Sequence, residues 1–112
     1  MPERERSDEG VKGPALHILL ALGPDAKHGY AVMQDIAACS GGRICILPGT
    51  LYSTIRKMLT EGLVEECAPP KDADSDDARR RYYRVTKAGR AAAQAETARL
   101  ALLVKLGKVF QG

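Results

Sequence analysis

The stretch from Leu47 to Leu63 constrains the fold of this chain most strongly. Pro48 suits the first turn of a helix, where its missing N–H group is not needed, and Gly62 suits the left-handed position that follows a helix end. Between them lie apolar residues at i, i+4, i+7 and i+8, namely Leu51, Ile55, Met58 and Leu59. The spacing predicts one helix with a single apolar stripe.

The opposite face of this predicted helix is polar and cationic. It carries hydroxyls and positive charges but no carboxylate: Thr50, Ser53, Arg56, Lys57 and Thr60. Such a surface can form hydrogen bonds to phosphates and to base edges. A merely solvated helix face is the alternative, and the neighbouring segments decide between the two.

Size and charge set further bounds. The chain has 112 residues, about one domain, and a net charge of only +3, so charge alone does not predict nucleic-acid binding. No apolar run approaches the roughly 20 residues that span a bilayer. Residues 1–13 have mixed charge and no apolar signal region. We therefore expect a flexible tail at 1–13 and a cytoplasmic protein without membrane contact.

Three cysteines, Cys39, Cys45 and Cys67, form neither a disulfide framework nor a zinc signature, since the number is odd and no CxxC pair occurs. Buried, reduced thiols are the expectation, and a thiol-responsive or metal-responsive sensor is a competing hypothesis. We predict no metal, no cofactor and no catalytic residues. The sequence offers no Ser/His/Asp arrangement, carboxylate pair or phosphate-cradling loop, which argues against an enzyme.

Residues 14–23 predict a helix that is apolar nearly all round. Such a helix must be covered on more than one side, and we predict that Leu16 and Leu20 contact a second chain. A turn at 23–27 and another helix at about 28–39 follow. The β-branched segment 43–46 predicts one brief strand before the central helix.

A hairpin with a long tip is expected next, with strands at 63–67 and 81–85. Tyr82 and Tyr83 are expected to serve the core and the strand pairing. The tip holds four aspartates, and the arginines Arg79, Arg80 and Arg81 follow it. Because like charge repels phosphate, we hypothesise that the tip stays mobile and away from DNA while these arginines contact it.

The last predicted helix runs from about 87 to 110, with Thr86 as its N-cap. Its apolar residues fall on two nearly opposite arcs, which need two covers: the chain's own domain and another chain. We therefore predict a homodimer and a dimerisation helix at 87–112. The predicted interface residues are Leu16, Leu20, Ala95, Ala98, Leu102, Leu106, Val109 and Phe110.

Three short helices, a β-hairpin and a final helix make up the order of a winged helix-turn-helix domain. The expected fold is mainly α with a small β-hairpin wing at 14–86, followed by the dimerisation helix. The central helix would enter the major groove. The wing would follow the backbone, and two units related by a two-fold axis would read two half-sites.

Three pieces of sequence resemble the PadR family of bacterial transcriptional regulators: His28-Gly29-Tyr30, Pro48-Gly49-Thr50-Leu51-Tyr52, and the run from Arg80 to Gly89. The short C-terminal segment resembles the subgroup with a single dimerisation helix. The resemblance implies a dimeric repressor whose Tyr30, Thr50 and Tyr52 lie at the DNA surface. Packing roles for the two tyrosines remain open.

Some members of that family hold flat drugs between their subunits with tryptophans of the last helix, and this chain has no Trp. A different ligand, no ligand, or a small hydrophobic effector on Leu102, Leu106 and Phe110 are the possibilities. The predicted DNA-binding residues are Tyr30, Thr50, Tyr52, Ser53, Thr54, Arg56, Lys57, Arg79, Arg80 and Arg81. A winged-helix module for protein–protein contacts is the main competing function.

Overall fold

The computed structural model describes residues 13–111. Three helices come first along the chain: α2 (Pro14–Leu22), α3 (Gly29–Cys39) and α4 (Pro48–Thr60). The short strand β1 (Lys27–His28) lies between α2 and α3. The hairpin strands β2 (Val64–Cys67) and β3 (Tyr82–Val85) flank the 3-10 turn η1 (Asp77–Arg79). Helix α5 (Lys87–Gly107) and the 3-10 turn η2 (Lys108–Phe110) complete the chain. Apart from Gly13, the predicted tail lies outside the described residues.

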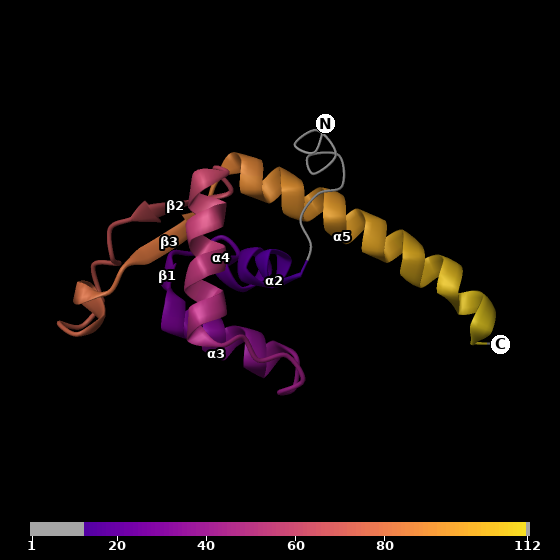
Figure 1. The fold of residues 1–112 in the computed structure, drawn as a ribbon, viewed down its shortest axis with the longest axis horizontal. Helices are drawn as coiled ribbons and strands as arrows, with labels where there is room; N and C mark the ends of the chain where they lie inside the picture. The colour runs from indigo at the N-terminus through magenta and orange to yellow at the C-terminus, as the bar shows by residue number, and fades with distance from the viewer. Residues whose placement is uncertain (1–12, 112) are drawn as a thin grey trace.

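Figure 1 shows α2, α3 and α4 gathered beside the small sheet, with α5 running away from this body. This arrangement confirms the expected winged helix-turn-helix, in which α3 and α4 form the helical pair and β2 and β3 form the wing. The Cα radius of gyration is 15.4 Å, against about 13 Å for a compact domain of this length. The projecting end of α5 explains the excess.

Helix α4 forms as its sequence predicts. It begins at Pro48, and Gly62 follows it with φ of 77°, the left-handed conformation expected there. Leu51, Ile55 and Met58 are buried, whereas Leu59 remains 36% exposed. Eight residues of α-helix rotate Leu59 about 80° away from Leu51, which leaves it at the edge of the stripe.

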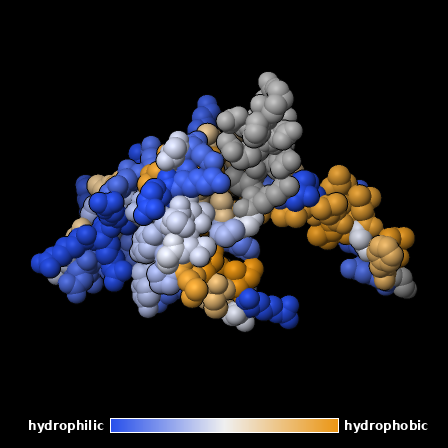
Figure 2. All heavy atoms as spheres, viewed as in Figure 1, coloured by the Kyte–Doolittle hydropathy of each residue, from blue (hydrophilic) through white to orange (hydrophobic). Residues whose placement is uncertain are grey.

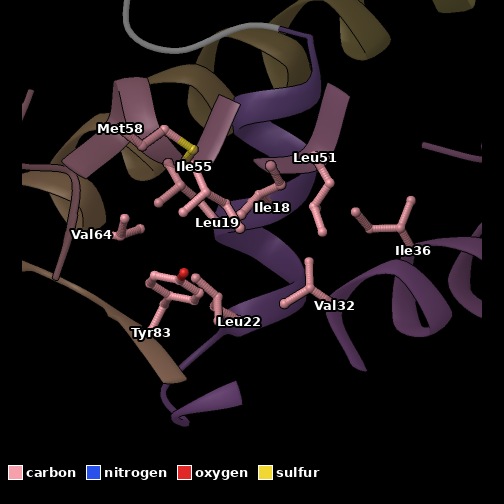
Figure 3. Close-up of a cluster of buried hydrophobic side chains, with 10 residues drawn as sticks. All are labelled: Ile18, Leu19, Leu22, Val32, Ile36, Leu51, Ile55, Met58, Val64 and Tyr83. Atoms are coloured by element: carbon pink, nitrogen blue, oxygen red, sulfur yellow. The ribbon is translucent and has the colours of Figure 1, made fainter. Parts of the chain in front are cut away.

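The core lies where α2 meets the other elements (Figure 3). Its members are aliphatic except for one tyrosine: Ile18, Leu19, Leu22, Val32, Ile36, Leu51, Ile55, Met58, Val64 and Tyr83. Burying each large aliphatic side chain contributes about 1.5–3 kcal/mol. The predicted all-round apolar helix is thus covered mostly by its own domain. Leu16 is only 7% exposed, so little of its side chain is available to a second chain.

The sheet has three strands rather than the expected two, in the order β1-β3-β2 with both pairs antiparallel. The predicted strand at 43–46 does not form. Instead, the Ile44 N–H donates to Ser40 Oγ at 2.9 Å, and the Arg43 N–H donates to the Ser40 carbonyl at 3.2 Å. This segment closes a turn after α3, and the free edge of β3 is taken by Lys27 and His28.

The junction between the wing and α5 is fixed by one threonine and one glycine. Thr86 Oγ1 donates to the Gly62 carbonyl at 2.5 Å and accepts from the Gly89 N–H at 3.0 Å, which confirms Thr86 as the N-cap. The Thr86 N–H also donates to the Leu63 carbonyl at 3.1 Å. A Cβ at Gly89 would collide with that carbonyl oxygen and approach Val85. Only glycine lets α5 start this close to the end of α4.

Candidate nucleic-acid interface

The outer face of α4 is open to solvent along its length. Its cations and hydroxyls are all exposed: Thr50, Ser53, Arg56, Lys57 and Thr60. Thr54, also predicted to contact DNA, is half-buried at the side of this face. Among residues 13–111, no carboxylate forms an ion pair with Arg56 or Lys57. Their charges are therefore available to an external anion.

Two of the three hydroxyls of this face form hydrogen bonds within their own helix. Ser53 Oγ donates to the Thr50 carbonyl at 3.1 Å, and Thr60 Oγ1 donates to the Arg56 carbonyl at 3.2 Å. In this rotamer the hydroxyl oxygen can still accept a hydrogen bond, for example from a base amino group. Donation to a phosphate requires the hydroxyl to turn outward. The two cations thus suit phosphate, and the hydroxyls suit base edges.

Tyr30 and Tyr52 lie at the point where α3 and α4 meet. A Cβ at Gly29 would stand 2.7 Å from the Tyr52 hydroxyl oxygen and 2.8–2.9 Å from two of its ring carbons, so the ring packs directly on the glycine. Tyr52 nevertheless remains 42% exposed, and Tyr30 is exposed as well. Tyr52 therefore packs against Gly29 and still exposes part of its side chain to solvent.

The wing presents its arginines unequally. Arg84 Nε donates to Glu65 Oε2 at 2.6 Å, and Arg81 Nε stands 3.9 Å from Glu66 Oε2. Both glutamates belong to β2, so the wing neutralises part of its own charge. The hydrogen bond that Arg84 donates to Glu65 raises the pKa of Arg84 above its ordinary value. Arg79 is exposed, and no described carboxylate forms an ion pair with it.

The acidic tip forms a hydrogen-bonded turn. The Asp77 N–H donates to Asp74 Oδ1 at 2.8 Å, and the Ala78 N–H donates to the Asp74 carbonyl at 2.8 Å. The Asp77 carboxylate then faces His28, with 3.8 Å between Oδ1 and Nε2. A capped turn and an electrostatic contact with the α3 terminus thus fold the tip back toward the body.

Tyr82 and Tyr83 are both buried, as expected, although neighbouring residues of a strand point to opposite faces. Tyr83 enters the core, and Tyr82 packs edge-on against His28 with 5.4 Å between ring centroids. Burial raises the pKa of both hydroxyls above the ordinary value, with nearby carboxylates adding to the effect. Tyr83 thus packs into the core, and Tyr82 packs against His28, its partner on the neighbouring strand β1.

The far half of α5, together with η2, forms a second exposed surface. All of its large apolar side chains are open to solvent, up to 91% for Phe110: Leu100, Leu102, Leu103, Val104, Leu106, Val109 and Phe110. Ala95, Ala98 and, on α2, Leu20 are exposed too. Figure 2 shows hydrophobic residues concentrated on this projecting end and hydrophilic residues over the wing. Contiguous apolar surface of this kind marks an interaction site.

The cysteines are not buried as expected. Cys39 and Cys45 are exposed because they flank the solvent-facing turn after α3. Cys67 is half-buried. Burial raises the pKa of the Cys67 thiol. Among the described residues, no group of three or more His, Cys, Asp or Glu is placed to hold a metal ion. Within 13–111, no helix combines the length and apolarity that crossing a bilayer requires.

Sequence reasoning missed three side chains near these surfaces. His28 caps α3, accepting from the Ala31 N–H at Nδ1; histidine is not among the residues typical of that position. Asp77 was counted only as part of an acidic tip. Glu96 is buried on α5, where it accepts from Arg99 through both carboxylate oxygens. An acid three residues before an arginine is the only sequence signal of that pair.

Comparison with protein-family models identifies one family. Residues 18–95 match the family described as the transcriptional regulator PadR-like family. A transcriptional regulator from Clostridium thermocellum superposes with a TM-score of 0.69 at 23% identity, over 87% of this chain and 91% of that one. A PadR family regulator from Clostridium difficile gives 0.70 at 19% identity, over 88% and 97%. One from Eggerthella lenta gives 0.60 at 28% identity, over 86% and 80%. No curated protein matches the chain.

Proposed function

The chain belongs to the PadR-like family of transcriptional regulators, and on that premise we propose that it is a cytoplasmic, dimeric repressor that binds two operator half-sites. In each half-site, α4 lies in the major groove and the wing follows the neighbouring phosphates. Two protomers related by a two-fold axis present two such helices. A small hydrophobic effector bound between the protomers releases the DNA.

One observation carries the DNA-binding proposal. The outer face of α4 holds two exposed cations, Arg56 and Lys57, without a paired carboxylate among the described residues. In a chain of net charge +3, this local excess is what would attract phosphate. The exposed hydroxyls beside the cations supply groups that can read base edges.

The exposed far half of α5 supports the dimer. A row of exposed leucines and valines that ends at Phe110 is unfavourable in water. A second copy of the same helix offers a matching apolar surface, as a two-fold interface requires. The same surface supports the effector, because Leu102, Leu106 and Phe110 would line a space between the two copies.

The experiment is a selection of duplexes from a randomised DNA library, followed by anisotropy titration of the enriched duplex over several salt concentrations. We expect a two-fold symmetric sequence with half-sites about one helical turn apart. Affinity should fall steeply as salt rises, with a slope of about −0.9 for each phosphate contacted. A failure to enrich any duplex, together with salt-independent binding, refutes the proposal and favours a protein-binding module.

The effector proposal has its own test. The dye 1-anilinonaphthalene-8-sulfonate reports exposed hydrophobic sites and serves as the probe. We expect the dye to weaken DNA binding by the wild-type dimer and to have a smaller effect on a Leu106→Ala variant that still dimerises. Equal effects on the two proteins would exclude this part of α5 as the effector surface.

A further inference from the structure

A carboxylate at the wing tip, Asp77, stands between the wing and the start of α3. Its Oδ1 atom lies 3.3 Å from Arg80 Nε and 3.8 Å from His28 Nε2. The backbone tightens the same turn, since the Arg80 N–H donates to the Asp77 carbonyl at 3.1 Å. One carboxylate oxygen therefore faces two cationic or hydrogen-bond-donating groups from different elements.

The Arg80 guanidinium is held on its other side by an aromatic ring. Its Cζ atom lies over the Tyr30 ring, 5.5 Å from the centroid, which is within cation–π range. The carboxylate engages Nε, so the donors on the two terminal nitrogens point elsewhere in the guanidinium plane. Arg80 is partly exposed in this position. The side chain is thus oriented before any ligand arrives.

His28 connects this arrangement to the helical pair. Its Nδ1 accepts from the Ala31 N–H at 3.2 Å, so the proton of a neutral imidazole resides on Nε2, the nitrogen that faces Asp77. The adjacent Gly29 packs against Tyr52 of α4. Asp77 therefore ties the wing to the N-terminus of α3 and, through it, to the helix that reads DNA in the proposed function.

We propose that Asp77 is a positioning residue for DNA binding, which holds Arg80 against Tyr30 so that its terminal nitrogens meet a backbone phosphate. The inference rests on the proposed function. It predicts a change in DNA affinity opposite to the one that electrostatic repulsion alone predicts. A carboxylate near DNA repels phosphate, so its neutralisation should strengthen binding; if Asp77 orients Arg80, neutralisation weakens binding.

The test compares Asp77→Asn with Asp76→Asn on the duplex selected as above. Both variants lose one negative charge at the same tip, but among the described residues the Asp76 side chain forms no hydrogen bond or ion pair. We expect Asp77→Asn to bind roughly 3- to 10-fold more weakly, since exposed ion pairs have modest strength and the dimer carries two copies. Asp76→Asn should bind equally or more tightly. Asp77→Glu should restore most of the affinity.

Two further measurements separate positioning from general stability. In an Arg80→Ala background, Asp77→Asn should have no additional effect on the dissociation constant, because the residue that it orients is gone. The thermal unfolding midpoint of Asp77→Asn should stay close to that of the wild type. Equal or tighter binding by Asp77→Asn, or an undiminished effect without Arg80, overturns the inference while wild-type DNA binding still stands. Absence of wild-type binding overturns the proposed function instead.

Discussion

Replacement of Gly89 by alanine tests the junction on which the placement of α5 depends. The new Cβ meets the Leu63 carbonyl oxygen, and that oxygen cannot turn away easily because it accepts the Thr86 N–H at 3.1 Å. Alanine gains up to about 1 kcal/mol in helix propensity over glycine. Overpacking costs about 1–3 kcal/mol, and a disturbed Thr86 cap costs about 1 kcal/mol more. We expect a net loss of about 1–3 kcal/mol in the free energy of unfolding.

The assay is thermal unfolding followed by far-UV circular dichroism, without DNA and at one fixed protomer concentration, because association shifts the midpoint. For a chain of this size the loss corresponds to a midpoint lower by roughly 4–12 °C. Gly49→Ala is the matched control, since Gly49 also lies in the first turn of a helix but a Cβ there meets no atom within 4 Å. A Gly89→Ala midpoint within about 2 °C of the wild type refutes the reasoning.

Three other expectations follow from exposed and buried groups. Lys57→Ala should weaken binding to all duplexes and flatten the salt slope by about 1 per protomer, because one phosphate contact is lost. Leu102→Asp with Leu106→Asp should halve the mass measured by light scattering, because charge is placed on the apolar face of α5. The raised pKa of Tyr82 means that the unfolded chain loses this proton first. The neutral hydroxyl therefore contributes to the free energy of unfolding below about pH 10, and this contribution is lost as the pH rises further. Above about pH 10, the urea midpoint of Tyr82→Phe should fall less with pH than that of the wild type.

Each of these has a matched comparison. Lys108→Ala removes the same charge from η2, outside the α4 face. An equal change in salt slope for the two variants would show that the effect of Lys57 is not specific to the α4 face. Leu47→Asp alters an exposed leucine that is not on α5, and it should leave the mass unchanged. Parallel alkaline curves for Tyr82→Phe and the wild type would show that this hydroxyl titrates alike in both states.

The sequence predicted those features that depend on local rules. Helix α4 follows from the apolar period between Pro48 and Gly62, and the start of α5 follows from Thr86, because caps and turns act within a few residues. The order of helices and strands then led to the winged helix. The outward placement of Lys57 needed only helix geometry, since the buried stripe determines which face remains.

What sequence reasoning missed depends on contacts between distant segments. The third strand arises because Lys27 and His28 lie beside Tyr82 and Tyr83, and no local pattern announces a strand of two residues. Likewise, Asp77 resembles its neighbouring acids until the fold brings His28 and Arg80 to it. The exposure of Cys45 follows from a turn at a position where a strand was expected, so one wrong element led to a second wrong assignment.

The junction at Gly89 links the two surfaces of the molecule. Helix α5 has 21 residues and is therefore about 32 Å long. A rotation of about 5° at one end moves the other by roughly 3 Å, a sizeable displacement against a half-site separation of about 34 Å. Because Thr86 and Gly89 fix α5 to the end of α4 through backbone groups, such a rotation is transmitted rather than absorbed. In the proposed dimer, a ligand that tilts the paired helices slightly would then move the two recognition helices out of register with their grooves, with no change inside either domain.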